Sequence, residues 1–165
     1  MTDNVLRRAR IAVLESLYES ESSNHDPEDV YERQMERAEQ EDPELAAEGP
    51  RGFGKGMLRG IWKNRQELDR HIGEAAPKYP VSAMAVVDRN VLRLAIWELV
   101  SGNSAPVGAI VNDAVELANR YGGESSPRFV NGVLRTVSKK LRGAEAPNGP
   151  PDEGATAISG DQEIS

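Results

Sequence analysis

The sequence predicts an all-α protein of about seven helices, followed by a C-terminal tail. Apolar residues recur at helical spacing along most of the chain, as Leu6, Ala9, Val13 and Leu17 do near the N-terminus. No segment combines period-2 alternation with turn dipeptides of the hairpin kind. Helix start and stop signals lie between the apolar runs, so each run is expected to be a separate helix.

The N-terminal half contains three or four of these helices. We expect the first over about residues 3–22. Asp26 and Pro27 open the second, over about 27–40, because an acidic N-cap followed by proline is a common helix start. Residues 41–52 have the composition of a loop or a fraying segment. A third helix and its continuation, or a fourth helix, are expected from the apolar residues Phe53, Met57, Leu58, Ile61, Trp62, Leu68 and Ile72.

The C-terminal half contains three more helices after a break marked by two prolines near residue 80. A strongly apolar helix is expected over about 86–101, with Gly102 just past its end. Pro106 opens the next helix, and the pair Ser126-Pro127 opens the last. In that last helix the small and polar residues of the motif Phe-Val-Asn-Gly are expected to serve close helix packing.

The overall composition limits the kinds of chemistry that the chain can perform. Its 165 residues correspond to one domain, and the absence of cysteine excludes disulfides, thiol catalysis and zinc sites built on cysteine. Two histidines are too few for an imidazole-rich metal site. No apolar stretch reaches the ~18 residues of a membrane helix, and arginines interrupt the N-terminus where a signal peptide would be apolar. We therefore expect a cytoplasmic protein without a metal site built on cysteine or histidine.

The negative charge is concentrated in two segments. The chain as a whole has a net charge of −7, which argues against a nucleic-acid partner. Residues 15–48 hold 13 acidic and two basic residues, and residues 143–165 hold five acidic residues and no base. The remainder has a net charge of +9, so it can form a basic surface despite the negative total. We expect a helical domain over 1–142 and a disordered acidic tail over 143–165.

Two other patterns are weak indications of a site. Residues 49–55 fit the first part of a nucleotide-binding P-loop, but Gly56 stands where Ser or Thr should bind Mg²⁺, and no strand precedes the segment. A flexible lead-in to a helix is the simpler interpretation. The dense carboxylates of the acidic segment are expected to form a solvated face, since acid–base chemistry would need a dry cleft.

Arginines near the start of the chain are the first candidates for binding. Arg7, Arg8 and Arg10 suit phosphate, because guanidinium groups bind its oxygens in pairs and a helix start adds positive potential. Alternatives stay open for two of them. Arg8 points away from the apolar stripe and could be solvated, and Arg10 lies within the stripe and could be a snorkelling or paired side chain.

The motifs of the C-terminal half resemble those of a known family. They are VDRNVLRLAIWEL at 87–99, AIVNDAVELANRYG at 109–122 and SSPRFVNGVL at 125–134, preceded by RRAR at 7–10 and by Leu17-Tyr18. In this order and spacing they resemble the NusB family of transcription antitermination factors. The resemblance covers about residues 5–142, and it departs from the family in Asp113, in Asn119 and in the acidic tail.

The resemblance implies an all-helical fold of two packed subdomains and a function without catalysis or a cofactor. Members of the family bind the boxA sequence of ribosomal RNA leader transcripts together with NusE, a ribosomal protein, and the complex lets RNA polymerase read through terminators. The arginine-rich first helix takes part in RNA binding. In the motif at 87–99, Asp88, Arg89 and Arg93 are further RNA-binding candidates.

Each of these residues also has a structural alternative. Asp88 could be the N-cap of its helix, Arg89 and Arg93 could form a surface ladder, and Arg93 could be paired in the interior. Tyr18 and Tyr79 could stack on RNA bases. The contact with the protein partner is predicted at Glu124, Ser125 and Arg128.

Two alternatives to RNA-binding antitermination remain. The chain could be a helical interaction module that binds a NusE-like partner and has little RNA affinity of its own, and an exposed apolar face could also form a homodimer. The accessory domain of an rRNA methyltransferase is disfavoured, because this chain is too short to hold the cofactor site of such an enzyme. The acidic tail could compete with RNA for the basic face.

Overall fold

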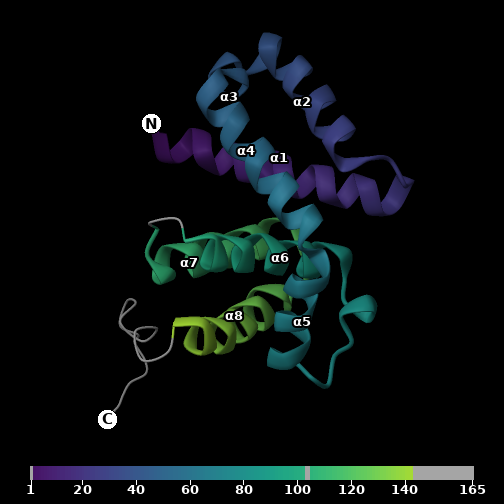
Figure 1. The fold of residues 1–165 in the computed structure, drawn as a ribbon, viewed down its shortest axis with the longest axis vertical. Coiled ribbons are helices and arrows are strands. Elements are labelled where there is room, and N and C mark those ends of the chain that lie inside the picture. The colour runs from purple at the N-terminus through teal and green to yellow at the C-terminus, as the bar shows by residue number, and fades with distance from the viewer. Residues whose placement is uncertain (1, 103–104, 143–165) are drawn as a thin grey trace.

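The computed structural model describes residues 2–102 and 105–142, and this part of the protein is built from helices (Figure 1). The all-α prediction is confirmed, and none of these helices is long and apolar enough to cross a membrane. The predicted tail over 143–165 lies outside the described residues. The helices are α1 (Thr2–Ser23), α2 (Pro27–Glu41), α3 (Pro43–Ala46), α4 (Glu48–Lys63), α5 (Arg65–Ala75), α6 (Val86–Ser101), α7 (Val107–Tyr121) and α8 (Ser126–Arg142), with a 3-10 helix, η1 (Val81–Ala83), before α6.

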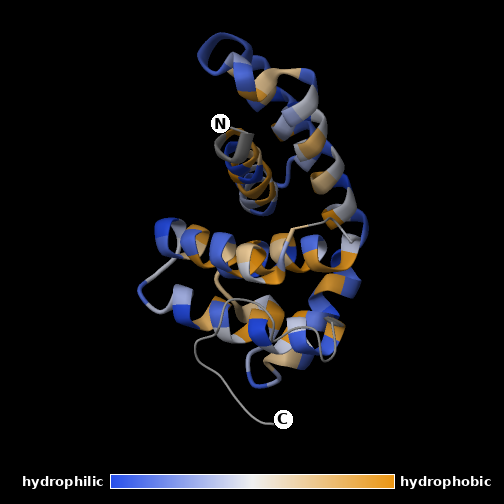
Figure 2. Cartoon of the chain, turned by 90° about the vertical axis from the view of Figure 1, so that its left-hand side faces the viewer, coloured by the Kyte–Doolittle hydropathy of each residue, from blue (hydrophilic) through white to orange (hydrophobic). Residues whose placement is uncertain are grey.

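The helices form two groups that share one core. In Figure 1, α1 to α4 make the upper group and α5 to α8 the lower one, and α6 packs against both α1 and α4. Buried side chains of the two groups, such as Leu17 and Met57 above and Ile96 and Leu134 below, belong to one continuous cluster. Figure 2 shows hydrophobic residues mainly on the sides of helices that face other helices. The two subdomains are therefore held together by apolar burial.

Helix ends fall close to where the sequence signals predict them. The carboxylate of Asp26 accepts a hydrogen bond of 2.8 Å from the N–H of Glu28, as an N-cap residue should. Gly102 ends α6 in the left-handed conformation, with φ of 77°, which glycine adopts without a steric penalty. At the start of α8, the hydroxyl of Ser126 accepts a 3.0 Å hydrogen bond from the N–H of Gly123.

The predicted loop over residues 41–52 is wrong, because α3 and the first turn of α4 occupy it. The reason lies in the packing of Tyr31, whose side chain is fully buried. Its O–H donates a 2.8 Å hydrogen bond to the carbonyl of Arg51, and its ring lies where a Cβ on Gly54 would stand. Glycine is needed there for close approach rather than for flexibility. The segment that resembles part of a P-loop is thus helical and forms no phosphate-binding loop.

Candidate nucleic-acid interface

Arg7 and Arg8 lie on α1 with their side chains partly exposed, at 48% and 37%. Arg7 forms ion pairs with Asp113 (3.0 Å) and Glu116 (2.6 Å) of α7. Arg8 is not simply solvated, since it forms a two-pronged pair with Asp42, with its Nε 2.8 Å from one carboxylate oxygen. Exposed pairs of this kind contribute about 1 kcal/mol or less. A phosphate group can therefore compete with the carboxylates for both guanidinium groups.

The Arg10 side chain is paired in the interior of the protein. Its guanidinium donates two hydrogen bonds to Glu98 of α6, at 2.7 and 2.8 Å. The Glu98 side chain is only 2% exposed, and that of Arg10 13%. The same guanidinium lies 5.2 Å from the centre of the Phe53 ring. Of the two alternatives for Arg10, the structure shows the paired one, and the pair joins the two subdomains.

Arg89 and Arg93 share a carboxylate of α1. Glu21 accepts hydrogen bonds from Arg89, from Arg93 at 2.9 Å and from the amide of Asn90 at 2.9 Å. Arg93, with a side chain only 9% exposed, also forms a two-pronged pair with Asp69 of α5, at 2.7 and 2.9 Å. The surface ladder is therefore not formed, and the interior pairing of Arg93 is. We name these five residues the Glu21 network.

The charge of Glu21 is maintained by this network. Burial by itself would raise the pKa of the Glu21 carboxyl. The hydrogen bonds from Arg89 and Asn90 and the positive charges of Arg89 and Arg93 outweigh burial, so the pKa lies below its ordinary value. The network thus holds an ionised carboxylate between α1, α5 and α6, and it positions the start of α6.

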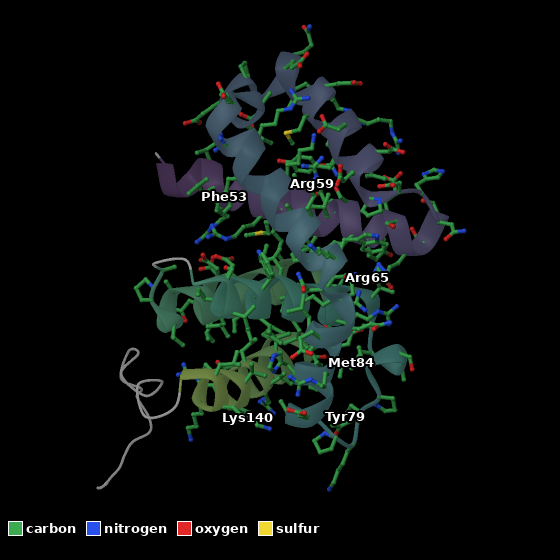
Figure 3. The ribbon with its side chains drawn as sticks, viewed as in Figure 1. Phe53, Arg59, Arg65, Tyr79, Met84 and Lys140 are labelled. Carbon is green, nitrogen blue, oxygen red and sulfur yellow. The ribbon has the colours of Figure 1, made fainter. Side chains whose placement is uncertain are left out.

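Several predicted site residues meet in one groove between the start of α6, the start of α8 and the chain that precedes η1. Its cavity has a volume of about 440 Å³, and we name it the Tyr79 groove. Tyr79 is 59% exposed, and its ring meets that of Phe129 edge to face, with 5.7 Å between centroids. Figure 3 shows Tyr79 and Met84 together on this side of the lower helices. The groove is lined by Tyr79, Pro80, Ala83, Met84, Asp88, Ser125, Arg128 and Phe129.

Asp88 supplies an unsatisfied acceptor in this groove. It is not the N-cap of α6, because Ala85 takes that position and Asp88 lies in the first turn. One of its carboxylate oxygens, Oδ1, is buried and has no hydrogen-bond partner among the described residues. A buried acceptor without a partner costs about 1–3 kcal/mol. An N–H donor that reached this oxygen would remove the penalty.

Tyr18 lies in a different groove, which we name the Tyr18 groove. It has a volume of about 550 Å³ and runs mainly between α1 and α2. Tyr18 is 48% exposed, and Glu15 and Glu19 stand beside it. Burial raises the pKa of Glu15, and the charges of Arg120 and Arg37 reduce the effect. The structure therefore does not bring Tyr18 and Tyr79 together on one surface.

The predicted separation of acidic and basic segments is only partly found. Much of the basic remainder is paired with the acidic segment 15–48, as Arg51 and Lys55 are with Glu32, at 2.8 Å each. The net charge of a segment predicts its surface charge poorly here, because ion pairs with residues far away in the sequence neutralise it. The following basic residues have no ion pair with any described residue: Arg37, Lys63, Arg65, Lys78, Arg120, Arg128, Arg135 and Lys139.

The predicted partner contacts overlap with the Tyr79 groove. Ser125 and Arg128 line it, and the exposed Glu124 directly precedes them. Phe129 is partly buried: it packs against the core and also forms part of the groove wall. Its position in the first turn of α8, next to Arg128, was the only signal for this role.

The expected packing role of the last motif is also wrong. Gly132 is exposed, and a Cβ built on it would meet nothing within 4 Å. The Asn131 amide oxygen accepts a long hydrogen bond of 3.4 Å from Arg135 instead of satisfying a backbone group. Asn112 of the motif at 109–122 is likewise exposed, on α7. These polar and small residues face outward.

Together, the two packed helical groups and the aromatic groove define an all-helical binding protein. The model of the NusB family matches residues 7–139. Transcription antitermination protein NusB of Dehalococcoides mccartyi is 43% identical over 135 residues, which cover 82% of this chain and 90% of the relative. NusB of Roseiflexus sp. is 41% identical over 138 residues, covering 82% and 93%. The chain belongs to the NusB family.

Solved structures agree with this assignment. T. maritima NusB superposes with a TM-score of 0.72 and 32% identity, covering 90% of this chain and 94% of that one. A second match is the structure of antitermination factors NusB and NusE in complex with dsRNA, with a TM-score of 0.72 and coverage of 83% and 98%. At 23% identity, this second match shows the fold alone.

Proposed function

We propose that this protein is a transcription antitermination factor that binds the boxA RNA of ribosomal RNA leader transcripts together with NusE. The complex would let RNA polymerase read through terminators. The curated relatives are antitermination proteins, and one chain of the same fold was solved with NusE and RNA. The protein acts by binding, without catalysis or a cofactor. Because bacterial transcription takes place in the cytoplasm, we propose that location for it.

The Tyr79 groove is the proposed RNA-binding site, and its combination of groups carries the proposal. An exposed aromatic ring, a guanidinium that forms no ion pair with the described residues and the side chain of Asp88 line the same cavity. Oδ1 of Asp88 is buried and has no hydrogen-bond partner among the described residues. Proteins read single-stranded RNA by stacking splayed bases and by hydrogen bonds to base edges. Tyr79 would stack on a base, the Asp88 carboxylate would accept from a base amino group, and Arg128 would bind phosphate.

Arg7 and Arg8 form the second proposed RNA contact. Their side chains are exposed enough to exchange a carboxylate for a phosphate oxygen. Arg10, Arg89 and Arg93 have a different proposed role. Their hydrogen bonds to Glu98 and within the Glu21 network fix the positions of α1, α5 and α6 relative to one another. They would act on RNA binding only by positioning the helices.

The Tyr18 groove is a candidate contact for NusE. Two carboxylates, of Glu15 and Glu19, and two guanidinium groups, of Arg33 and Arg37, line this groove, so a protein surface with charges of both signs would complement it. The exposed ring of Tyr18 would supply an aromatic anchor, as is common in protein interfaces. Glu124, at the edge of the Tyr79 groove, remains a second candidate for this partner.

A titration with labelled RNA tests the proposal. The full chain is mixed with a boxA RNA and with a scrambled RNA of the same length, with and without NusE, and fluorescence anisotropy is followed. We expect a preference for boxA that increases with NusE and weakens with salt. Indifference to boxA in both conditions would overturn the function. Binding of NusE without any gain in RNA affinity would favour the protein-interaction module instead.

A further inference from the structure

Helix α8 presents a line of positive charge to solvent. It carries five basic residues and no acidic one. Arg128, Arg135 and Lys139 are exposed, and none forms an ion pair with a described residue. Lys140, on a neighbouring face, differs because it pairs with Glu74 at 3.1 Å. We name Arg128, Arg135 and Lys139 the α8 stripe.

The spacing of the stripe aligns its three side chains. Intervals of seven and four residues bring them to almost the same angle around a helix of 3.6 residues per turn. The stripe therefore runs straight along α8 for about 16 Å from Arg128 to Lys139. Its first member, Arg128, also lines the Tyr79 groove. The groove and the stripe thus form one continuous surface.

Gly132 lies on the same face, between Arg128 and Arg135. Glycine inside a helix is unfavourable relative to alanine. No packing requirement explains it here, since a Cβ would stand in open space. The missing side chain leaves the backbone of α8 open to close approach at this point. The open space over Gly132 would let a nucleic-acid backbone approach α8 closely at this point.

We propose that RNA bound in the Tyr79 groove continues along α8, with its phosphates on the α8 stripe and its backbone passing over Gly132. The inference rests on the proposed function, because the groove supplies the base contacts. Three cations in a row that pair with no carboxylate of the described residues fit the regular negative charge of a nucleic-acid backbone. An acidic protein segment would satisfy the charges too, but it would not require a continuous path from an aromatic groove.

The first test compares two RNAs and two charge-matched variants of the full chain. One RNA contains boxA alone, and the other contains boxA with ten-nucleotide extensions on both sides. Arg135→Gln/Lys139→Gln removes two charges from the stripe, and Lys55→Gln/Lys63→Gln removes two from α4. We expect the stripe variant to lose affinity for the extended RNA at least fivefold, to keep its affinity for the short RNA, and to reduce the salt slope for the extended RNA by about 1.4. The α4 variant should match wild type on both RNAs.

The outcomes separate the two proposals. If the stripe and α4 variants bind the extended RNA equally, the stripe is not an RNA path, even though boxA binding stands. If the stripe variant binds the extended RNA more weakly only when an acidic protein partner is added, an acidic segment is the occupant and the proposal fails. If wild type does not distinguish boxA from the scrambled RNA, the underlying function fails.

The second test replaces single glycines by alanine. Gly132→Ala and Gly73→Ala both add a methyl group that meets nothing within 4 Å inside a helix. We expect both to raise the melting temperature, but only Gly132→Ala to weaken binding of the extended RNA, by at least threefold. Unchanged RNA affinity in Gly132→Ala together with a higher melting temperature would contradict the passage of RNA over this face.

Discussion

Arg10 and Glu98 form a two-pronged ion pair, with N···O distances of 2.7 and 2.8 Å, that connects α1 to α6 across the two halves of the fold. Glu98 is 2% exposed, so removal of Arg10 takes two charged hydrogen bonds away from a buried carboxylate. We expect Arg10→Met to lower the free energy of unfolding by about 3–5 kcal/mol. Arg10→Met/Glu98→Leu should recover most of the loss. Urea denaturation followed by circular dichroism measures both.

An RNA titration of the same double variant examines the role of Arg10. If Arg10 only positions helices, the refolded double variant should bind boxA RNA like wild type. A tenfold loss of affinity in a variant with wild-type stability would show that Arg10 contacts the RNA directly.

The Glu21 network predicts a loss of stability in acid. Since the folded state lowers the pKa of Glu21, its contribution is complete above the ordinary value of 4.5 and is lost as pH falls below it, through the depressed folded pKa. Glu21→Gln should therefore destabilise the protein at pH 7 and flatten the stability profile below pH 4.5. Thermal unfolding from pH 7 to pH 3 measures this. Parallel wild-type and variant curves over that acid range would contradict the assignment.

Variants of Tyr79 examine the RNA groove. Base stacking on an aromatic side chain is worth about 1–3 kcal/mol, so Tyr79→Ala should weaken boxA RNA binding by about 5- to 150-fold. Tyr79→Phe keeps the ring and should keep most of the affinity. Because Tyr79 is 59% exposed, neither change should shift the melting temperature strongly. Equal RNA affinity of Tyr79→Ala and wild type would remove the groove from the RNA site.

Glycines of α4 have opposite roles that alanine substitution can distinguish. At Gly54 an added Cβ would overlap the buried ring of Tyr31, and overpacking costs about 1–3 kcal/mol. At Gly56 the space is open, and alanine should stabilise the helix by up to about 1 kcal/mol. Denaturant midpoints of the two variants should therefore move in opposite directions. A stabilising Gly54→Ala would show that Tyr31 does not pack there.

The acidic residues of 143–165 are predicted to compete with RNA. A protein of residues 1–142 should bind boxA RNA more tightly than the full chain at low salt, because five negative charges have been removed. The difference should disappear at high salt, where the charges are screened. Equal affinities at 50 mM salt would exclude the competition.

Local signals predicted the helices well. Asp26 with Pro27 and the glycine at 102 act within a few residues of their own position, and the structure shows the corresponding helix ends. The segment 41–52 was predicted wrongly because distant contacts shape it: Tyr31 donates a hydrogen bond to the carbonyl of Arg51 and packs against Gly54, just after the segment. A glycine that permits close packing and a glycine that permits flexibility look the same in a sequence.

The candidate site was harder to predict than the fold. Arg7, Arg8, Arg10 and Arg93 are chemically alike in the sequence, yet the first two are partly exposed and the last two are enclosed with carboxylates. The partners of Arg10 and Arg93 lie 88 and 24 residues away along the chain. Neither helical periodicity nor a local motif can indicate a partner at such a separation along the chain.

The sequence by itself determined the helical class, most helix ends, the family resemblance and the absence of cysteine chemistry. Each of these depends on residue types, on spacings within one helix or on the order of motifs along the chain. Only the tertiary structure decided which arginines are exposed, that Tyr79 and Arg128 share a groove, and that the acidic segment neutralises much of the basic remainder. The physical reason is that ion pairs and grooves form between helices, and their packing, rather than order along the chain, sets which charges meet.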